Sequence, residues 1–191
     1  MSDFEIRPVT ADDAEAISRI YRYYVENTAV SYEYEAPDKA EFERRIGETL
    51  KRYPYIAAVR DGDVIGYAYA GAFNGRRAAD RTAEASIYVA RSERRSGVGR
   101  ALYERLEALL SRQNVQVLTA KVACCDREDD SHLSRDSVEF HLRCGYRTVG
   151  VVENCGYKFG RWYGLMIMQK DIGSFPEEGA EFIPYPLLGS P

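Results

Sequence analysis

Apolar residues recur along this chain with two different periods, and each period predicts a type of element. Spacings of three and four residues indicate amphipathic helices, whereas alternation and short apolar runs indicate strands. Helices are predicted over residues 11–25, from about 38 to 50, after Gly97 and over 137–144. Strands are predicted over residues 4–9, 55–59, 64–73, 82–89, 115–122, 149–152 and 162–168. The order β-α-α-β-β-β-α-β-α-β-β predicts one α/β domain built on a mixed sheet.

Polar residues mark where several of these elements begin and end. Thr10 and Asp13 have the spacing of a capping box at the start of the first helix. Asp61-Gly62-Asp63, between two apolar runs, predicts a hairpin. Beyond residue 171 the chain is rich in Pro, Gly and Glu. We therefore expect a domain over residues 1–171 and a tail over 172–191.

The composition narrows the class of protein. The 191 residues are 45% hydrophobic and 29% charged, which fits one globular domain and excludes disordered and collagen-like chains. No apolar run is long enough to span a membrane, and the first residues do not resemble a signal peptide. The four cysteines form no CxxC pair and accompany only two histidines. We expect reduced thiols in a cytoplasmic protein and no metal site.

The charge of the chain is unevenly distributed. The formal net charge is −4, but residues 76–100 hold seven arginines (76, 77, 81, 91, 94, 95 and 100) against three acids (Asp80, Glu84 and Glu93), a local charge of +4. A basic edge on an acidic body fits a phosphorylated cofactor better than it fits nucleic acid. We therefore expect no nucleic-acid partner.

The most specific motif is Arg94-Arg95-Ser96-Gly97-Val98-Gly99-Arg100, which lies between a predicted strand and an amphipathic helix. Glycine lets the backbone approach a ligand, and the free N–H groups of a helix start attract anions. The arginines add charge-assisted donors. The motif has neither the Gly-Lys-Ser/Thr of a Walker loop nor the third glycine of a dinucleotide fingerprint. It predicts a pyrophosphate site, and the alternative is an ordinary basic strand–helix turn.

The spacing Arg94-x-x-Gly97-x-Gly99 resembles the Q/R-x-x-G-x-G/A acetyl-CoA motif of the GNAT acyltransferases. The segments that extend this resemblance to the phosphinothricin acetyltransferase-like branch include Ile6-Arg7-Pro8, Gly66-Tyr67-Ala68-Tyr69-Ala70, Thr82-Ala83-Glu84 and Gly156-Tyr157-Lys158-Phe159-Gly160-Arg161-Trp162. The resemblance covers about residues 4–171. It implies a splayed, mostly antiparallel central sheet flanked by helices, an acetyl-CoA-dependent N-acetyltransferase and a homodimer.

The resemblance also implies where acetyl-CoA binds. The pantetheine arm would bond to the backbone where two strands separate, and the pyrophosphate would lie at the start of the following helix. The cofactor-binding residues implied in this way are Ile87, Tyr88, Val89, Arg94, Arg95, Ser96, Gly97, Val98, Gly99, Arg100 and Ser137.

Glu84 is the predicted base. Strand alternation places Glu84 on the same face as Tyr88. The alternative is a cross-strand ion pair with Arg76 or Arg81. Because an amine with a pKa of about 10 is mostly protonated at pH 7, Glu84 would act through a water molecule. The resemblance gives His141 as general acid or polar contact, although a lone histidine on a short helix is often structural, and Tyr88 is the alternative proton donor.

The resemblance assigns four residues to the acceptor, namely Tyr32, Arg76, Lys158 and Arg161. The basic loop around Arg76 favours a small amine with an acidic group, such as an amino acid or an amino-acid analogue. Two alternatives stay open. One is an acetyltransferase acting on polyamines or on peptide or protein N-termini, and the other is a non-catalytic acyl-CoA-binding module.

Overall fold

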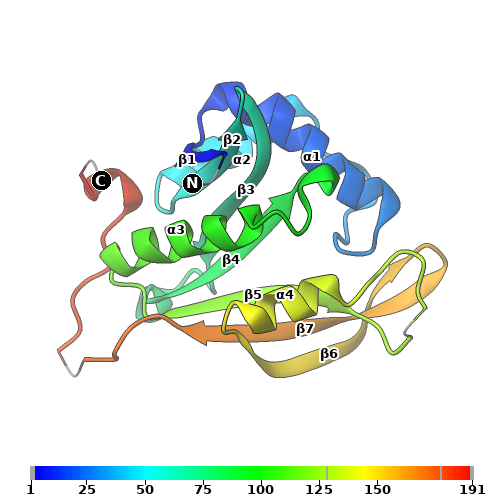
Figure 1. The fold of residues 1–191 in the computed structure, drawn as a ribbon. Coiled ribbons are helices and arrows are strands. Elements are labelled where there is room, and N and C mark those ends of the chain that lie inside the picture. The colour runs from blue at the N-terminus through cyan, green and yellow to red at the C-terminus, as the bar shows by residue number, and fades with distance from the viewer. Residues whose placement is uncertain (1–2, 128, 177, 190–191) are drawn as a thin grey trace.

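Seven strands form one mixed sheet within the residues that this computed structural model describes, which are 3–127, 129–176 and 178–189 (Figure 1). The strand order is β1-β2-β3-β4-β5-β7-β6. The strands are β1 (Glu5–Pro8), β2 (Tyr55–Arg60), β3 (Asp63–Ala72), β4 (Thr82–Val89), β5 (Val117–Cys124), β6 (Arg147–Lys158) and β7 (Arg161–Asp171). The helices are α1 (Ala14–Asn27), α2 (Lys39–Leu50), α3 (Val98–Arg112) and α4 (Asp136–Arg143).

Strands β4 and β5 separate shortly after they begin. They run parallel and pair over Thr82–Glu84 and Val117–Thr119. Farther along, β4 remains paired with β3 and β5 remains paired with β7. Figure 1 shows the resulting gap between β4 and β5, with α3 and α4 on one side of it. The backbone N–H and C=O groups that face this gap are therefore available to a ligand.

Helices cover both faces of the sheet. Ala83 and Ala85 lie in the core beneath α3, where Leu102, Leu106 and Leu110 are fully buried. On the other face, Tyr88 packs against the buried side chains of α1 and α2. The small residues on one side of β4 allow α3 to lie close to the sheet. The opposite face carries the larger aromatic side chains.

The structure confirms the predicted order of elements and refines their limits. Thr10 and Asp13 form the predicted capping box, and the Thr10 N–H donates to the Asp13 carboxylate at 2.8 Å. The hairpin turn places Asp61 and Gly62 at positive φ values of 52° and 88°. The strand expected over 149–152 is much longer, because two bulges let it follow β7 from Arg147 to Lys158.

The segment expected to be a tail packs against the domain. Its backbone bonds to two elements: Ile183 N–H donates to Gln113 O at 3.1 Å, and Tyr185 N–H donates to Arg52 O at 3.0 Å. Phe182 and Tyr185 also pack against the core beneath α3. Figure 1 shows this segment, coloured orange to red, returning from β7 toward the N-terminal strands. In the described ranges, no helix has the length and apolar character needed to cross a membrane.

Candidate active site

A groove of about 570 Å³ extends from the start of α3 along β4, and we call it the α3 groove. It brings together eight of the residues predicted to bind the cofactor, which are Ile87, Val89, Arg94, Arg95, Gly97, Gly99, Arg100 and Ser137. Of the other three, Val98 is fully buried in the core, and the Ser96 hydroxyl donates to Glu93 O at 2.6 Å. Tyr88 lies between Ile87 and Val89, but its side chain is on the opposite face of β4 and does not line this groove.

The start of α3 is shaped to receive an anion. Gly97 is the N-cap residue and has a φ of 89°, a left-handed conformation that favours glycine. The first N–H groups of the helix have no partner within the helix and carry its positive dipole end. Arg94, Arg95 and Arg100 line the same end of the groove. This combination can bind the phosphates of a nucleotide cofactor.

Asp136, at the start of α4, faces the arginines of the α3 groove. Its carboxylate oxygens lie 3.9 Å from Arg94 Nη1 and 3.7 Å from Arg95 Nη2. Asp136 is not among the residues that the sequence predicts for the site. The carboxylate reduces the positive charge that the arginines offer to a phosphate group.

A second, smaller cavity of about 60 Å³ lies deeper between β4 and β5, and we call it the inner cleft. Three residues line both the inner cleft and the α3 groove, namely Val30, Ile87 and Ser137. The inner cleft is also lined by Glu84, Tyr88 and His141, the three residues predicted to be catalytic. The two spaces are therefore adjacent. The arginines at the start of α3 line the wider one, and the candidate base lines the narrower one.

Glu84 lies where β4 and β5 begin to separate. Its Oε2 is 2.8 Å from Nζ of Lys121, and its side chain is 25% exposed. The sequence analysis considered Arg76 and Arg81 as partners, and the structure instead pairs Glu84 with Lys121 of β5. The sequence does contain a feature that could have identified Lys121, because it is the one charged residue of β5. A carboxylate held in this position can accept a proton from an incoming amine or from water.

His141 is buried and both of its ring nitrogens are occupied. Nδ1 is 2.7 Å from Ser137 O, and because a carbonyl oxygen only accepts, Nδ1 carries the hydrogen. Nε2 is 2.8 Å from the Tyr103 hydroxyl, which donates to it when the ring is neutral. Burial lowers the pKa of His141 and favours this neutral form. Tyr103 also lines the inner cleft, and the sequence analysis did not identify it.

Tyr88 belongs to a cluster of aromatic rings beneath α1. Its ring centroid is 4.8 Å from that of Tyr21, 5.2 Å from Tyr24 and 5.5 Å from Tyr67. Burial raises the pKa of Tyr88 well above its ordinary value, so the hydroxyl keeps its proton at neutral pH. Tyr88 is therefore a packed aromatic residue with one edge on the inner cleft.

Tyr32 and Lys158 are held together at the side of the site. The Tyr32 hydroxyl donates to Gly164 O at 2.7 Å, and its ring lies so close to Gly156 that a Cβ there would be 2.5 Å from the ring. Lys158 is 4% exposed, and its ammonium donates to Val25 O, Thr28 O and Ser31 O at 2.7, 3.0 and 2.8 Å, respectively.

These contacts change how Lys158 is interpreted. Its three donors are satisfied by backbone carbonyls at the end of α1 and in the loop that carries Tyr32, so the structure does not support direct contact with a substrate. Burial also lowers the pKa of Lys158. Lys158 is better described as an anchor for the loop between α1 and α2.

The two arginines assigned to the acceptor also lie outside the α3 groove and the inner cleft. Arg161 is bound to Asp130 at 2.8 Å. Arg76 is exposed in the loop before β4. Arg81, from the same loop, donates to the tail at Gly179 O and Ala180 O at 2.7 and 3.1 Å. Among the described residues, no group of three or more His, Cys, Asp and Glu side chains could hold a metal ion.

Comparison with known proteins agrees with this arrangement. The family model described as Acetyltransferase (GNAT) domain matches residues 6–167. The chain is 35% identical over 170 residues to a phosphinothricin N-acetyltransferase of Alcaligenes faecalis, an alignment covering 88% of this chain and 83% of the relative. It is 30% identical over 169 residues to an L-methionine sulfoximine/L-methionine sulfone acetyltransferase of Pseudomonas paraeruginosa, covering 87% and 94%.

A solved structure is similar over nearly the whole length. It is the crystal structure of a GNAT superfamily phosphinothricin acetyltransferase from Sinorhizobium meliloti in complex with AcCoA, with a TM-score of 0.83 and 31% sequence identity. The alignment covers 98% of this chain and 100% of that chain. The matched family model includes both walls of the α3 groove and the whole inner cleft. The chain therefore belongs to the GNAT family and is an acetyl-CoA-dependent N-acetyltransferase.

Proposed function

We propose that this enzyme acetylates the amino group of an amino acid or amino-acid analogue that bears an acidic group. The observation that carries the proposal is that the α3 groove, with its cationic helix start, lies directly beside the inner cleft that holds the Glu84 carboxylate. The relatives named for phosphinothricin and methionine sulfoximine support acceptors of this type. Arg76 is the basic residue proposed for the acidic group.

The cofactor would be held by residues of the α3 groove. The start of α3, with Arg94, Arg95 and Arg100, would bind the pyrophosphate. Backbone groups of β4 from Ile87 to Val89 would bind the pantetheine arm, where Val89 O already accepts from the Tyr24 hydroxyl at 2.6 Å. Ser137 would contact the arm from α4. Acetyl-CoA supplies the acetyl group as a thioester. The residues of the inner cleft would then control the proton transfers of the reaction.

We assign the reaction to direct attack of the amine in a ternary complex. The new C–N bond forms as the C–S bond breaks, the amine loses one proton and the departing thiolate gains one. Glu84 would accept the amine proton through a water molecule. Tyr88 is the proposed source of the thiolate proton. His141 is the alternative source from the sequence, but its one N–H is bonded to Ser137 O and its Nε2 accepts from the Tyr103 hydroxyl, so its proposed role is a polar contact that orients Tyr103 at the inner cleft.

We propose a homodimer in the cytoplasm. The exposed apolar side chains of β6 support self-association, because Val149, Val151 and Val152 are 53%, 47% and 52% exposed. The free state of all four cysteines fits a reducing compartment. Light scattering tests the dimer directly, and a monomer at micromolar concentration would contradict it.

The proposed activity is tested by thiol release from acetyl-CoA over a panel of acceptors. The panel contains amino acids, sulfoximines, polyamines and peptides. We expect turnover with at least one amino acid or sulfoximine and little turnover with polyamines and peptides. Preferential acetylation of a polyamine or of a peptide N-terminus would overturn the proposed acceptor class.

A further inference from the structure

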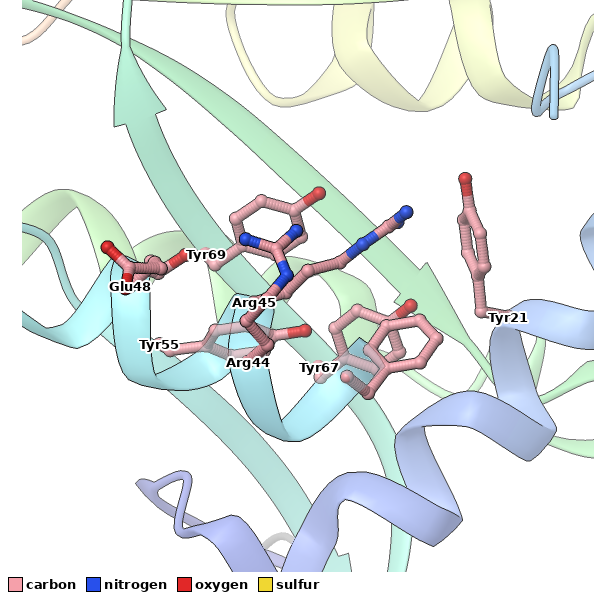
Figure 2. Close-up of a pocket in the computed structure, with 9 residues that line it drawn as sticks. Tyr21, Arg44, Arg45, Glu48, Tyr55, Tyr67 and Tyr69 are labelled. Atoms are coloured by element: carbon pink, nitrogen blue, oxygen red, sulfur yellow. The ribbon is translucent and has the colours of Figure 1, made fainter. Parts of the chain in front are cut away.

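A recess of about 260 Å³ lies beneath α2, on the face of the sheet that carries Glu84 and Tyr88. We call it the α2 recess. Figure 2 shows its walls, with tyrosine rings of β2 and β3 on one side and the side chains of Arg44 and Arg45 from α2 on another. It is separate from the α3 groove, with which it shares no lining residue.

Two tyrosine hydroxyls give this recess polar groups without protein partners. Tyr55 and Tyr67 are each 1% exposed, and both line the α2 recess. In the described part of the chain, neither hydroxyl hydrogen-bonds to another protein group. Two hydroxyls that line one recess and have no protein partner among the described residues can hydrogen-bond to a molecule bound there.

The strand register connects this recess to the candidate base. Tyr55 lies opposite Tyr69 of β3, and Tyr69 lies opposite Ser86 of β4, two residues from Glu84. Neighbouring strands are about 4.8 Å apart, so the row from β4 to β2 spans about 10 Å. The Glu84 carboxylate is close enough to Tyr69 to contribute, with burial as the main cause, to its raised pKa. The recess and the inner cleft share no lining residue, but Tyr69 at the edge of the recess lies beside Ser86 of the inner cleft, so the two spaces are neighbours on one face of the sheet.

The walls of the recess favour a flat, uncharged group. The rings of Tyr55 and Tyr69 are stacked with centroids 4.8 Å apart, and Phe42 and Tyr21 add a further edge-to-face pair. The volume exceeds the roughly 150 Å³ that is enough to bind benzene.

The arginines at the recess are already neutralised. Arg44 binds Glu41 at 2.8 Å, and Arg45 binds Glu41 at 2.8 Å and Glu33 at 2.9 Å. The recess therefore has no unpaired arginine to attract a second acidic group. The free hydroxyls of Tyr55 and Tyr67 can instead bond to a neutral polar atom.

We propose that the α2 recess binds the side chain of the acceptor, and that the preferred acceptor is an amino acid with an aromatic or heteroaromatic side chain that ends in a hydrogen-bonding atom. This inference rests on the proposed acetylation of an amino acid and specifies the side chain. The α-carboxylate supplies the acidic group, and the ring occupies the space between α2 and the strand tyrosines.

The test compares the rates of acetylation of amino acids with and without a ring side chain. One variant fills the recess, and another removes its two hydroxyl groups. Thr49→Trp adds a large side chain at a position that lines the recess. Glu43→Trp, on the exposed side of α2, is its matched control. Tyr55→Phe with Tyr67→Phe removes both hydroxyls and keeps the rings. Thiol release is measured with tyrosine, histidine, phenylalanine and alanine, and the melting temperature of each variant is recorded.

We expect kcat/KM for tyrosine to exceed that for alanine by about tenfold or more in the wild type. Thr49→Trp should abolish that preference, whereas Glu43→Trp should keep both the preference and the alanine rate. The double phenylalanine variant should lose discrimination between tyrosine and phenylalanine. An unchanged preference in Thr49→Trp and in the double variant would overturn the recess alone. No thiol release with any acceptor in the wild type would overturn the proposed function together with the recess.

Discussion

The carboxylate of Glu84 lies 2.8 Å from the ammonium of Lys121, across the point where β4 and β5 separate. The pair holds the carboxylate at the edge of the inner cleft. Lys121→Met should lower kcat about fivefold, a factor equivalent to the roughly 1 kcal/mol of a partly exposed ion pair. Lys121→Arg should restore the rate, because arginine keeps the positive charge. Steady-state kinetics at saturating acetyl-CoA would measure both effects, and an unchanged kcat in Lys121→Met would contradict the positioning role.

Asp136 should weaken cofactor binding in the wild type, because its carboxylate lies within 4 Å of Arg94 and Arg95. Asp136→Asn keeps the shape of the side chain and removes its charge. We expect acetyl-CoA to bind about two- to fivefold tighter, as removal of about 0.5–1 kcal/mol of competing charge interaction requires. Calorimetric titration gives the dissociation constant. Glu139→Gln is the control, since Glu139 lines the same groove but pairs with Arg143. Equal affinity of Asp136→Asn and wild type would show that the carboxylate does not compete.

His141 should make the folded protein less stable in mild acid. Burial lowers its pKa below the ordinary value of 6.5, so below that pH the unfolded chain binds a proton that the folded chain does not. The free energy of unfolding should therefore decrease as the pH falls from 6.5 toward the folded pKa. His141→Gln should flatten this part of the curve, measured as denaturant midpoint against pH. His132→Gln removes the other histidine and is the matched control. The same slope in His141→Gln and wild type would contradict this assignment.

Lys158 should act on the acceptor through the loop that it anchors. Lys158→Met leaves the carbonyls of Val25, Thr28 and Ser31 without their donor, and we expect a loss of about 2–4 kcal/mol in the free energy of unfolding. Because Tyr32 belongs to the same loop, KM for the acceptor should rise while the affinity for acetyl-CoA remains constant. Lys51→Met, at an exposed position, is the control. A normal acceptor KM in a folded Lys158→Met protein would argue against the anchoring role.

Much of the fold could be predicted because its signals are local. The alternation along β4 predicts that its side chains divide between two faces. In the structure Ala83 and Ala85 pack beneath α3, whereas Tyr88 packs on the other face against α1. The motif from Arg94 to Arg100 predicts an anion site because its glycines and arginines act within one turn and the first turn of one helix. In such cases residues close in sequence determine the geometry.

The hydrogen-bond and ion-pair partners of the predicted residues could not be predicted from local sequence patterns. Lys121 reaches Glu84 only because β5 pairs in parallel with β4, and the Tyr103 hydroxyl reaches His141 only after α3 and α4 pack side by side. The carbonyl groups that bind Lys158 come from a helix end more than a hundred residues away. Each contact depends on how distant segments pack together, and the hydrophobic pattern of a single segment does not determine that packing.

In the proposed reaction Glu84 accepts the amine proton, and the site holds acetyl-CoA independently of that carboxylate. This is tested most directly by measuring thiol release from acetyl-CoA by wild type and by Glu84→Gln, with an acceptor amine that the wild-type enzyme acetylates. The affinity of each protein for acetyl-CoA is measured in parallel. We predict that Glu84→Gln binds acetyl-CoA as tightly as wild type does and loses about 100-fold or more of its rate at neutral pH. An undiminished rate in Glu84→Gln would contradict this role of Glu84.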